Sequence, residues 1–148
     1  MKNILCLAIG LLFLLTGCHK SSYQKAVAGT TWEEKPLVGK FAGSYYWIRF
    51  HQDNTFDMKL RLFTDVIDTG TVPCSNNRTD YIKGTYTING TQIAFDGRYC
   101  DEAFNNIQAN CQGHGSYQAS YSMTFMGSDL VFDAEKNDYQ KIWLIKQY

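Results

Sequence analysis

Three cysteines and one histidine have the residue types and the spacing for disulfide or metal chemistry. They are Cys74, Cys100, Cys111 and His114. In an exported chain two thiols normally form a disulfide, whereas Cys111-x-x-His114 together with the other two thiols has the donor set of a Cys₃His zinc site. The paired C-x-x-C spacing typical of zinc knuckles does not occur in the sequence. We therefore expect a disulfide and no metal centre.

Three disulfide pairings remain open, because three thiols allow one bond and one free cysteine. Cys100–Cys111 would close the segment 101–115 and leave Cys74 free, and we prefer this pairing. Closing a loop of that size stabilises a fold by roughly 3 kcal/mol in the chain-entropy model. The alternatives, Cys74–Cys111 and Cys74–Cys100, would instead tie two long connections together.

The carboxylates and histidines of the chain offer little for catalysis. Asp101 and Glu102 are neighbours in a polar segment, but adjacency in sequence does not aim two carboxylates at one reacting atom. His51 lies at the end of an expected strand beside a turn, and His114 lies between two glycines. The sequence contains no Gly-x-Ser-x-Gly elbow, phosphate-binding loop or His-Glu-x-x-His motif. We expect a noncatalytic protein that needs no cofactor.

Aromatic side chains are the residues best suited to bind a ligand. Tyrosine combines an apolar ring with a polar hydroxyl, which suits the wall of a pocket. Six aromatic residues fall on expected inward strand faces: Tyr46, Tyr86, Phe95, Tyr99, Tyr117 and Tyr121. Small barrels also fill their interiors with such side chains, so the sequence leaves open whether these residues pack together or line a cavity.

β-Strands are the elements that must position these residues. From residue 30 onward apolar and polar residues alternate, and aromatic and β-branched residues dominate the alternating runs. Strands are predicted at about 30–36, 44–52, 55–66, 80–88, 91–100, 116–126, 129–134 and 139–146. Short polar turns separate most of them, which predicts an all-β barrel or a β-sandwich.

The turn at Asn89-Gly90 is the strongest hairpin signal, because Asn-Gly favours a type I′ turn. A two-residue loop there gathers the apolar residues of both strands on one face. It also places Gly84 opposite Phe95, which leaves room for the ring. A slip of one residue would scramble the faces, so the alternation predicts which side chains point inward.

Three further strand pairs follow from the same reasoning. Gly127-Ser128 suits a two-residue type II′ loop. The turn at 52–55 needs an odd loop, most simply of three residues, to keep its apolar residues on one face. The last pair, joined around 136–138, ends in a strand that is apolar on both sides. That pattern indicates either a covered outer face or closure against the first strand.

Two long connections, 67–79 and 101–115, lie at the same end of the expected sheet, because the strands alternate in direction. This end would therefore form an elaborated mouth. Connections longer than about 12 residues are usually functional or disordered.

The N-terminus has the pattern of an export signal. Lys2 precedes an apolar run at 4–15, which is shorter than the roughly 20 residues that a membrane-spanning helix needs. Its length and flanks fit the core of a signal peptide. The following Leu15-Thr16-Gly17-Cys18 resembles the lipobox of bacterial lipoproteins. The resemblance implies cleavage before Cys18 and acylation of its thiol by fatty acids such as palmitate.

The expected organisation is a lipoprotein signal peptide at 1–17, a lipidated tether at 18–28 and a β-barrel domain at 29–148. An aspartate directly after the acylated cysteine would resemble the inner-membrane retention signal of enterobacterial lipoproteins, but position 19 is histidine. In a cell with two membranes, this favours the outer membrane. The chain has 14 basic and 14 acidic residues and no net charge, so we expect no nucleic-acid partner.

Several motifs resemble those of the small bacterial lipocalin-like lipoproteins. They are Gly29-Thr30-Thr31-Trp32, Asp53-Asn54-Thr55-Phe56 and the run from Gly84-Thr85-Tyr86 to Ile93-Ala94-Phe95. The resemblance implies an eight-stranded up-and-down antiparallel barrel that can hold one small ligand.

The sequence thus leads to two hypotheses for an envelope protein held to the lipid bilayer by acylated Cys18. In the first, the barrel binds a small apolar or amphipathic ligand. In the alternative, the barrel is a protein-interaction, inhibitor or assembly module of the cell envelope, which contacts a protein partner through the loops 67–79 and 101–115.

Overall fold

The computed structural model describes residues 21–35, 42–64, 74, 77–134 and 141–148. They form one short helix and eight strands. The bounds are α2 Ser22–Val27, β1 Thr31–Glu34, β2 Ala42–Phe50, β3 Thr55–Thr64, β4 Arg78–Asn89, β5 Gln92–Cys100, β6 Ser116–Met126, β7 Asp129–Asp133 and β8 Lys141–Gln147. Each strand end lies within two residues of its predicted position. The predicted signal peptide, 1–17, lies outside the described residues, as does Cys18.

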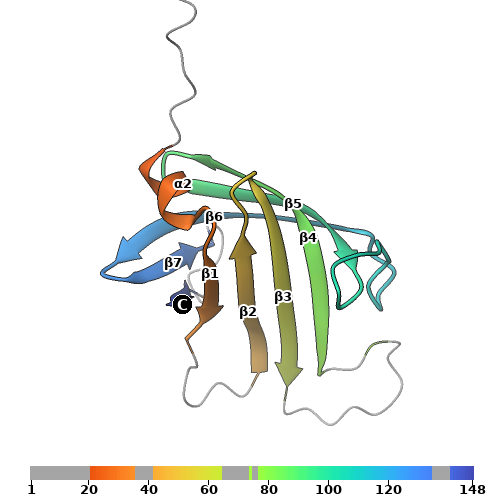
Figure 1. The fold of residues 1–148 in the computed structure, drawn as a ribbon. Helices are drawn as coiled ribbons and strands as arrows, with labels where there is room; N and C mark the ends of the chain where they lie inside the picture. The colour runs from red at the N-terminus through yellow and green to blue at the C-terminus, as the bar shows by residue number, and fades with distance from the viewer. Residues whose placement is uncertain (1–20, 36–41, 65–73, 75–76, 135–140) are drawn as a thin grey trace, which may run out of the picture.

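The strands form a closed up-and-down antiparallel barrel in sequential order from β1 to β8 (Figure 1). The barrel closes where β8 pairs with β1, with Glu33 opposite Ile145. The outer apolar residues of the last strand therefore flank this seam, as one of the two interpretations predicted. Because every strand has two partners, the barrel has no open sheet edge, and the sandwich alternative is wrong.

Apolar side chains fill the interior between the strands. Period-two alternation sends them inward from every strand, and nearly all are less than a tenth exposed. The cluster of buried residues is Val27, Trp32, Ile48, Phe50, Phe56, Met58, Leu60, Ile82, Tyr86, Ile93, Phe95, Met123, Leu130, Phe132, Ile142 and Leu144. Removal of this apolar surface from water is the main force that stabilises the barrel.

Two of the predicted hairpins are confirmed in detail. Met126 pairs with Asp129 across a two-residue loop, as the turn between β6 and β7 predicts. The loop between β2 and β3 has three residues, because the N–H of His51 donates a 2.9 Å hydrogen bond to the carbonyl of Thr55. An odd loop keeps the inward faces of the two strands continuous.

The pairing register of the hairpin between β4 and β5 differs from the predicted one by two residues. Asn89 pairs with Gln92, so the loop is Gly90-Thr91 rather than Asn89-Gly90. Gly90 has a φ of 60°, the left-handed value that a type II′ turn requires at its first central position. The single glycine therefore sets the turn, and Asn89 remains the last residue of its strand.

This shift keeps every side chain on its predicted face but changes its partner. Gly84 pairs with Gly97, and Phe95 pairs with Tyr86. The room that the glycines leave is used by a different ring, since a Cβ atom on Gly97 would lie 3.0 Å from Cζ of Phe56. The predicted position of Gly84 opposite Phe95 is therefore wrong, although a ring does pack over the glycine pair.

Helix α2 corrects the predicted extent of the tether. Residues 22–27 belong to the predicted tether but form a helix that packs on the end of the barrel where the short hairpins lie (Figure 1). Val27 is fully buried, and the ring of Tyr23 stacks on Phe125 at 5.5 Å. Burial of these apolar groups stabilises the helix, and the mostly polar composition of the segment does not predict this. The folded domain begins at this helix and not at residue 29.

The contribution of α2 to stability can be measured by truncating Val27. Val27→Ala is expected to lower the free energy of unfolding by about 2 kcal/mol, because it removes two buried methyl groups and leaves a small cavity. Lys25→Ala on the exposed side of the same helix is the control, and its effect should stay within about 0.5 kcal/mol. Equal, small effects in urea denaturation would show that α2 does not belong to the cooperative unit.

Candidate binding site at the barrel mouth

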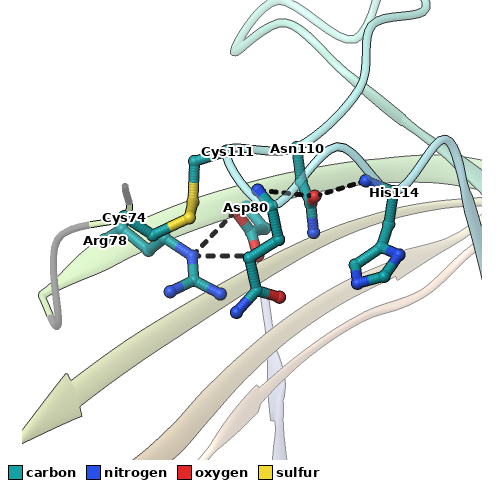
Figure 2. The surroundings of a disulfide bond; sticks show 7 residues. Cys74, Arg78, Asp80, Asn110, Cys111 and His114 are labelled. Atoms are coloured by element: carbon teal, nitrogen blue, oxygen red, sulfur yellow. Dashed lines mark hydrogen bonds and ion pairs between the residues drawn. A yellow bond between two sulfur atoms is a disulfide. The ribbon is translucent and has the colours of Figure 1, made fainter. Parts of the chain in front are cut away.

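A disulfide joins the two long connections at the mouth of the barrel. Cys74, just before β4, bonds to Cys111, which lies between β5 and β6 at a sequence separation of 37 residues (Figure 2). The preferred pairing of Cys100 with Cys111 is therefore wrong, and the bond is one of the two alternatives that tie the connections together. It confirms that both connections lie at one end.

The direction of Cys100 explains why it stays free. Tyr99 points into the barrel, so Cys100 points outward, where the following segment folds back over it. Gln108 donates its backbone N–H to Tyr99 O at 3.0 Å and its side-chain amide to Cys100 O at 3.1 Å. Cys100 is 2% exposed, and burial raises the pKa of its thiol. The chain reaches the rim only after this fold-back, where Cys111 meets Cys74.

The adjacent carboxylates of the same segment serve different partners. Asp101 accepts hydrogen bonds from the backbone N–H groups of Asn105 at 2.8 Å and Asn106 at 3.2 Å. These bonds hold the pKa of Asp101 below its usual value. Glu102 instead interacts with the hydroxyl of Tyr81 on the outer wall. Asp101 therefore orders its own loop, and the two carboxylates do not converge on one point.

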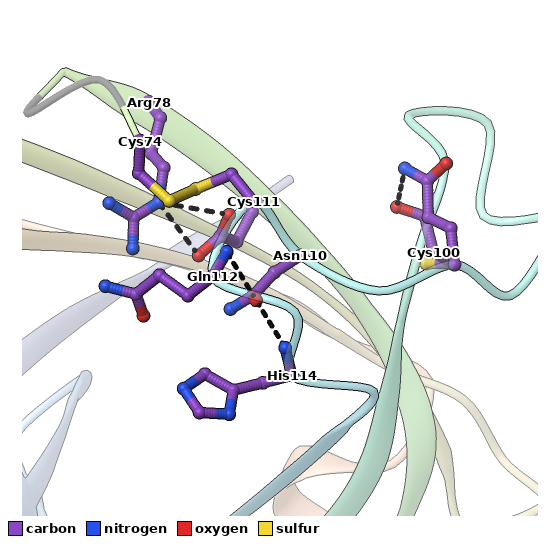
Figure 3. A network of polar contacts seen from close by, with 9 residues as sticks. Cys74, Arg78, Cys100, Asn110, Cys111, Gln112 and His114 are labelled. Carbon is purple, nitrogen blue, oxygen red and sulfur yellow. Dashed lines mark hydrogen bonds and ion pairs between the residues drawn. A yellow bond between two sulfur atoms is a disulfide. The ribbon is translucent and has the colours of Figure 1, made fainter. Parts of the chain in front are cut away.

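A tight turn presents Cys111 and His114 at the rim. The side-chain oxygen of Asn110 accepts hydrogen bonds from the backbone N–H groups of Gln112 at 3.0 Å and His114 at 2.9 Å (Figure 3). Figure 3 also shows the side chains of Arg78, Gln112 and His114 projecting to the same side of the disulfide. Among the described residues no group of three His, Cys, Asp or Glu side chains could hold a metal ion. The disulfide takes two thiols that the zinc alternative needs.

A hollow lies beside this disulfide. It has a volume of about 200 Å³, and its lining includes Arg78, Asp80, Tyr99 and Asn110. Arg78 and Asp80 occupy inward positions of β4 and form an ion pair with an N–O distance of 3.4 Å. The carboxylate of Asp80 is only 8% exposed, so this pair is shielded from solvent.

Four of the six predicted aromatic residues gather in the same half of the barrel. Tyr46 lies across the interior from Tyr121, and polar contacts link the hydroxyl of Tyr121 with those of Tyr46 and Tyr117. The ring of Tyr99 packs edge-on against Tyr117 at 6.4 Å. All four residues are partly exposed, whereas the phenol groups of Tyr46, Tyr117 and Tyr121 are largely buried.

The other two predicted residues lie deeper. Tyr86 and Phe95 are each 2% exposed and pack within the apolar cluster. Phe95 touches the ring of Tyr121 from below at 6.2 Å, and Phe132 stacks on Tyr121 at 5.4 Å. These rings form a packed floor, so in this structure Tyr86 and Phe95 support the site and do not line it.

The charged residues of the site are not among the residues predicted from the sequence. Glu34 is 3% exposed on the inner face of β1, where it accepts a hydrogen bond from the backbone N–H of Tyr46 at 3.1 Å. Arg78 and Asp80 likewise point inward from β4. The period-two alternation continued from Trp32 and Ile82 would have placed all three on the inner face.

The high pKa values of the inner tyrosines predict a pH dependence. Burial, and then the neighbouring phenols, raise the pKa of Tyr46, Tyr117 and Tyr121 well above the usual value near 10. Below about pH 10 the phenols are neutral in both the folded and the unfolded chain, so their ionisation takes nothing from the stability of the barrel. Above it the unfolded chain ionises first, so stability should fall as the pH rises.

A phenolate absorbance titration, read together with far-ultraviolet circular dichroism, measures this effect. Part of the tyrosine signal should appear only as the barrel unfolds at alkaline pH. Titration of all ten tyrosines near pH 10 in an intact barrel would contradict the prediction.

The fold and the site together define a small closed β-barrel whose mouth is locked by one disulfide and lined by tyrosines. No family model matches the chain, and neither a curated protein nor a solved structure is significantly similar to it. None of the described helical residues form a helix that is long and apolar enough to cross a membrane.

Proposed function

We propose that the protein is a lipid-anchored protein of the cell envelope that binds a small amphipathic molecule at the barrel mouth without catalysis. The observation that carries the proposal is the layer of partly exposed tyrosines, whose hydroxyls contact one another, above a packed apolar floor. Rings with polar tips suit a ligand that has both apolar and polar parts. The resemblance to small bacterial lipocalin-like lipoproteins supports the same proposal.

The packed floor refines the kind of ligand. Rings of Phe95 and Phe132 pack against Tyr121 and occupy the interior beneath it, where a long apolar chain would otherwise lie. The layer above this floor instead holds phenol hydroxyls, and the ion pair of Arg78 and Asp80 lies in the lining of the hollow beside the disulfide. An amphipathic ligand is therefore favoured over a purely apolar one. Anchoring through Cys18 is supported by its lipobox pattern.

Binding of a fluorescent amphipathic probe, 1-anilinonaphthalene-8-sulfonate, tests the site. Tyr46→Phe and Tyr121→Phe are each expected to weaken binding about fivefold, since each removes one hydrogen-bonding hydroxyl. Tyr45→Phe is the matched control, because Tyr45 lies on the outer face and its hydroxyl bonds to Glu33 at 2.6 Å. Equal affinities for all three variants would contradict the proposed site.

Native mass spectrometry of the protein purified from its host tests the proposal with the natural ligand. A bound small molecule that the Tyr121→Phe variant retains less well would support it. A ligand-free mass, together with no binding of the fluorescent probe, would contradict the proposed ligand binding.

A protein-interaction role is the second candidate, and one observation favours it. Ile107 is 48% exposed on the ordered segment between β5 and β6, where an apolar side chain is available to a partner. Ile107→Asp should then abolish capture of an envelope partner while leaving probe binding and stability unchanged. Loss of the partner in Tyr121→Phe but not in Ile107→Asp would place the contact inside the mouth.

A further inference from the structure

The two ends of the barrel are built differently. All three short hairpins, which join β2 to β3, β4 to β5 and β6 to β7, lie at one end together with α2, and we call this the closed end. The long connections lie at the opposite end, the mouth (Figure 1). The position of the N-terminal segment relative to these ends determines how an anchored barrel would stand on a membrane.

Helix α2 is attached firmly to the closed end. Gln24 donates its side-chain amide to Asn54 in the β2–β3 turn at 2.6 Å, and Tyr23 stacks on Phe125 near the end of β6. The helix begins at a defined point, because the hydroxyl of Ser21 accepts a hydrogen bond from the backbone N–H of Gln24 at 3.1 Å. The chain therefore enters the domain at a fixed position.

Very little chain separates this point from Cys18. Three residue steps lead from Cys18 to Ser21, and even fully extended they span no more than about 11 Å. A strand as long as β3, with 10 residues, extends roughly 33 Å along the barrel wall. An anchor at Cys18 could not reach past the barrel to the mouth.

The closed end also carries exposed apolar side chains. Met126, at the β6–β7 turn, is 54% exposed and follows Phe125, which packs against α2. Tyr148 is fully exposed directly after Gln147, which pairs with Thr31 at the start of β1. Apolar and amphipathic side chains of this kind are favoured at the interface of a bilayer.

We infer that the closed end rests on the lipid bilayer and that the tyrosine-lined mouth faces away from it. The inference depends on the proposed acylation of Cys18. Met126 contacts the membrane interface, and the ligand enters the mouth from the aqueous side. A ligand carried by this protein would therefore be exchanged with soluble partners and not directly with the membrane that holds the anchor.

Tryptophan quenching by brominated lipid tests this orientation. Met126→Trp and Ile107→Trp form a matched pair, because the native side chains are 54% and 48% exposed at opposite ends of the barrel. Each full-length acylated variant is reconstituted into vesicles of phosphatidylethanolamine and phosphatidylglycerol with bromine in the acyl chains. The native protein supplies the background from Trp32, Trp47 and Trp143.

The expected result is an added, strongly quenched emission in Met126→Trp and an added, unquenched emission in Ile107→Trp. Equal quenching of both variants, or quenching of Ile107→Trp alone, overturns the orientation. Intact mass and vesicle flotation are read on the same samples. A chain that is not acylated and does not float overturns both anchoring and orientation, whereas a floating chain without quenching at 126 overturns the orientation alone.

Discussion

Gly84→Ala should unfold the barrel or lower its free energy of unfolding by at least about 3 kcal/mol. A Cβ atom at this position would lie 2.1 Å from the carbonyl oxygen of Asp96 and 2.5 Å from Cα of Gly97. Both atoms belong to the backbone of the paired strand, so no flexible side chain can move aside. The variant must separate β4 from β5, which share nine paired positions in the barrel wall.

Gly115→Ala is the control for this substitution. A Cβ atom on Gly115 would meet no heavy atom within 4 Å, so its effect should stay within about 0.5 kcal/mol. Urea denaturation followed by circular dichroism compares the two variants with the native protein. A Gly84→Ala protein as stable as the control would mean that the close approach of the two strands is not needed for folding.

Much of the fold could be predicted because each strand alternates strictly between apolar and polar residues. A one-residue error would have moved the apolar face to solvent, so the inward faces of β4 and β5 were predicted correctly. A two-residue error has no such penalty, and this is the error that occurred at Gly90. Periodicity therefore constrains the face of a residue far more strongly than its partner.

The candidate site was predicted less completely, because its members are brought together by tertiary structure. The tyrosines could be predicted because they are aromatic residues at inward positions of the predicted strands. Glu34 was missed because a carboxylate is normally exposed, yet it is 3% exposed here and bonds to the neighbouring strand. The pairing of Cys111 depends on how residues after Cys100 fold back, and spacing alone does not contain that information.

Reduction of the Cys74–Cys111 disulfide should lower the free energy of unfolding by about 4 kcal/mol in the chain-entropy model. The bond closes a loop of 37 residues, which is far longer than the segment that a Cys100–Cys111 bond would close. A longer loop loses more freedom in the unfolded chain, so its closure stabilises more. The bond also holds Cys111 beside Arg78 and Asp80, so probe binding at the mouth should weaken as well.

The loss of stability on adding dithiothreitol, compared among cysteine variants, distinguishes between the possible disulfide pairings. The double variant Cys74→Ser/Cys111→Ser should start at the lower stability and show no response to the reductant. Cys100→Ala should lose some stability because its thiol is buried, but it should keep the full response of the native protein, since Cys100 is free. If Cys100→Ala lost that response, Cys100 would be a member of the bond. The response to reductant, and not the size of each variant's loss, therefore identifies the two cysteines that lock the mouth.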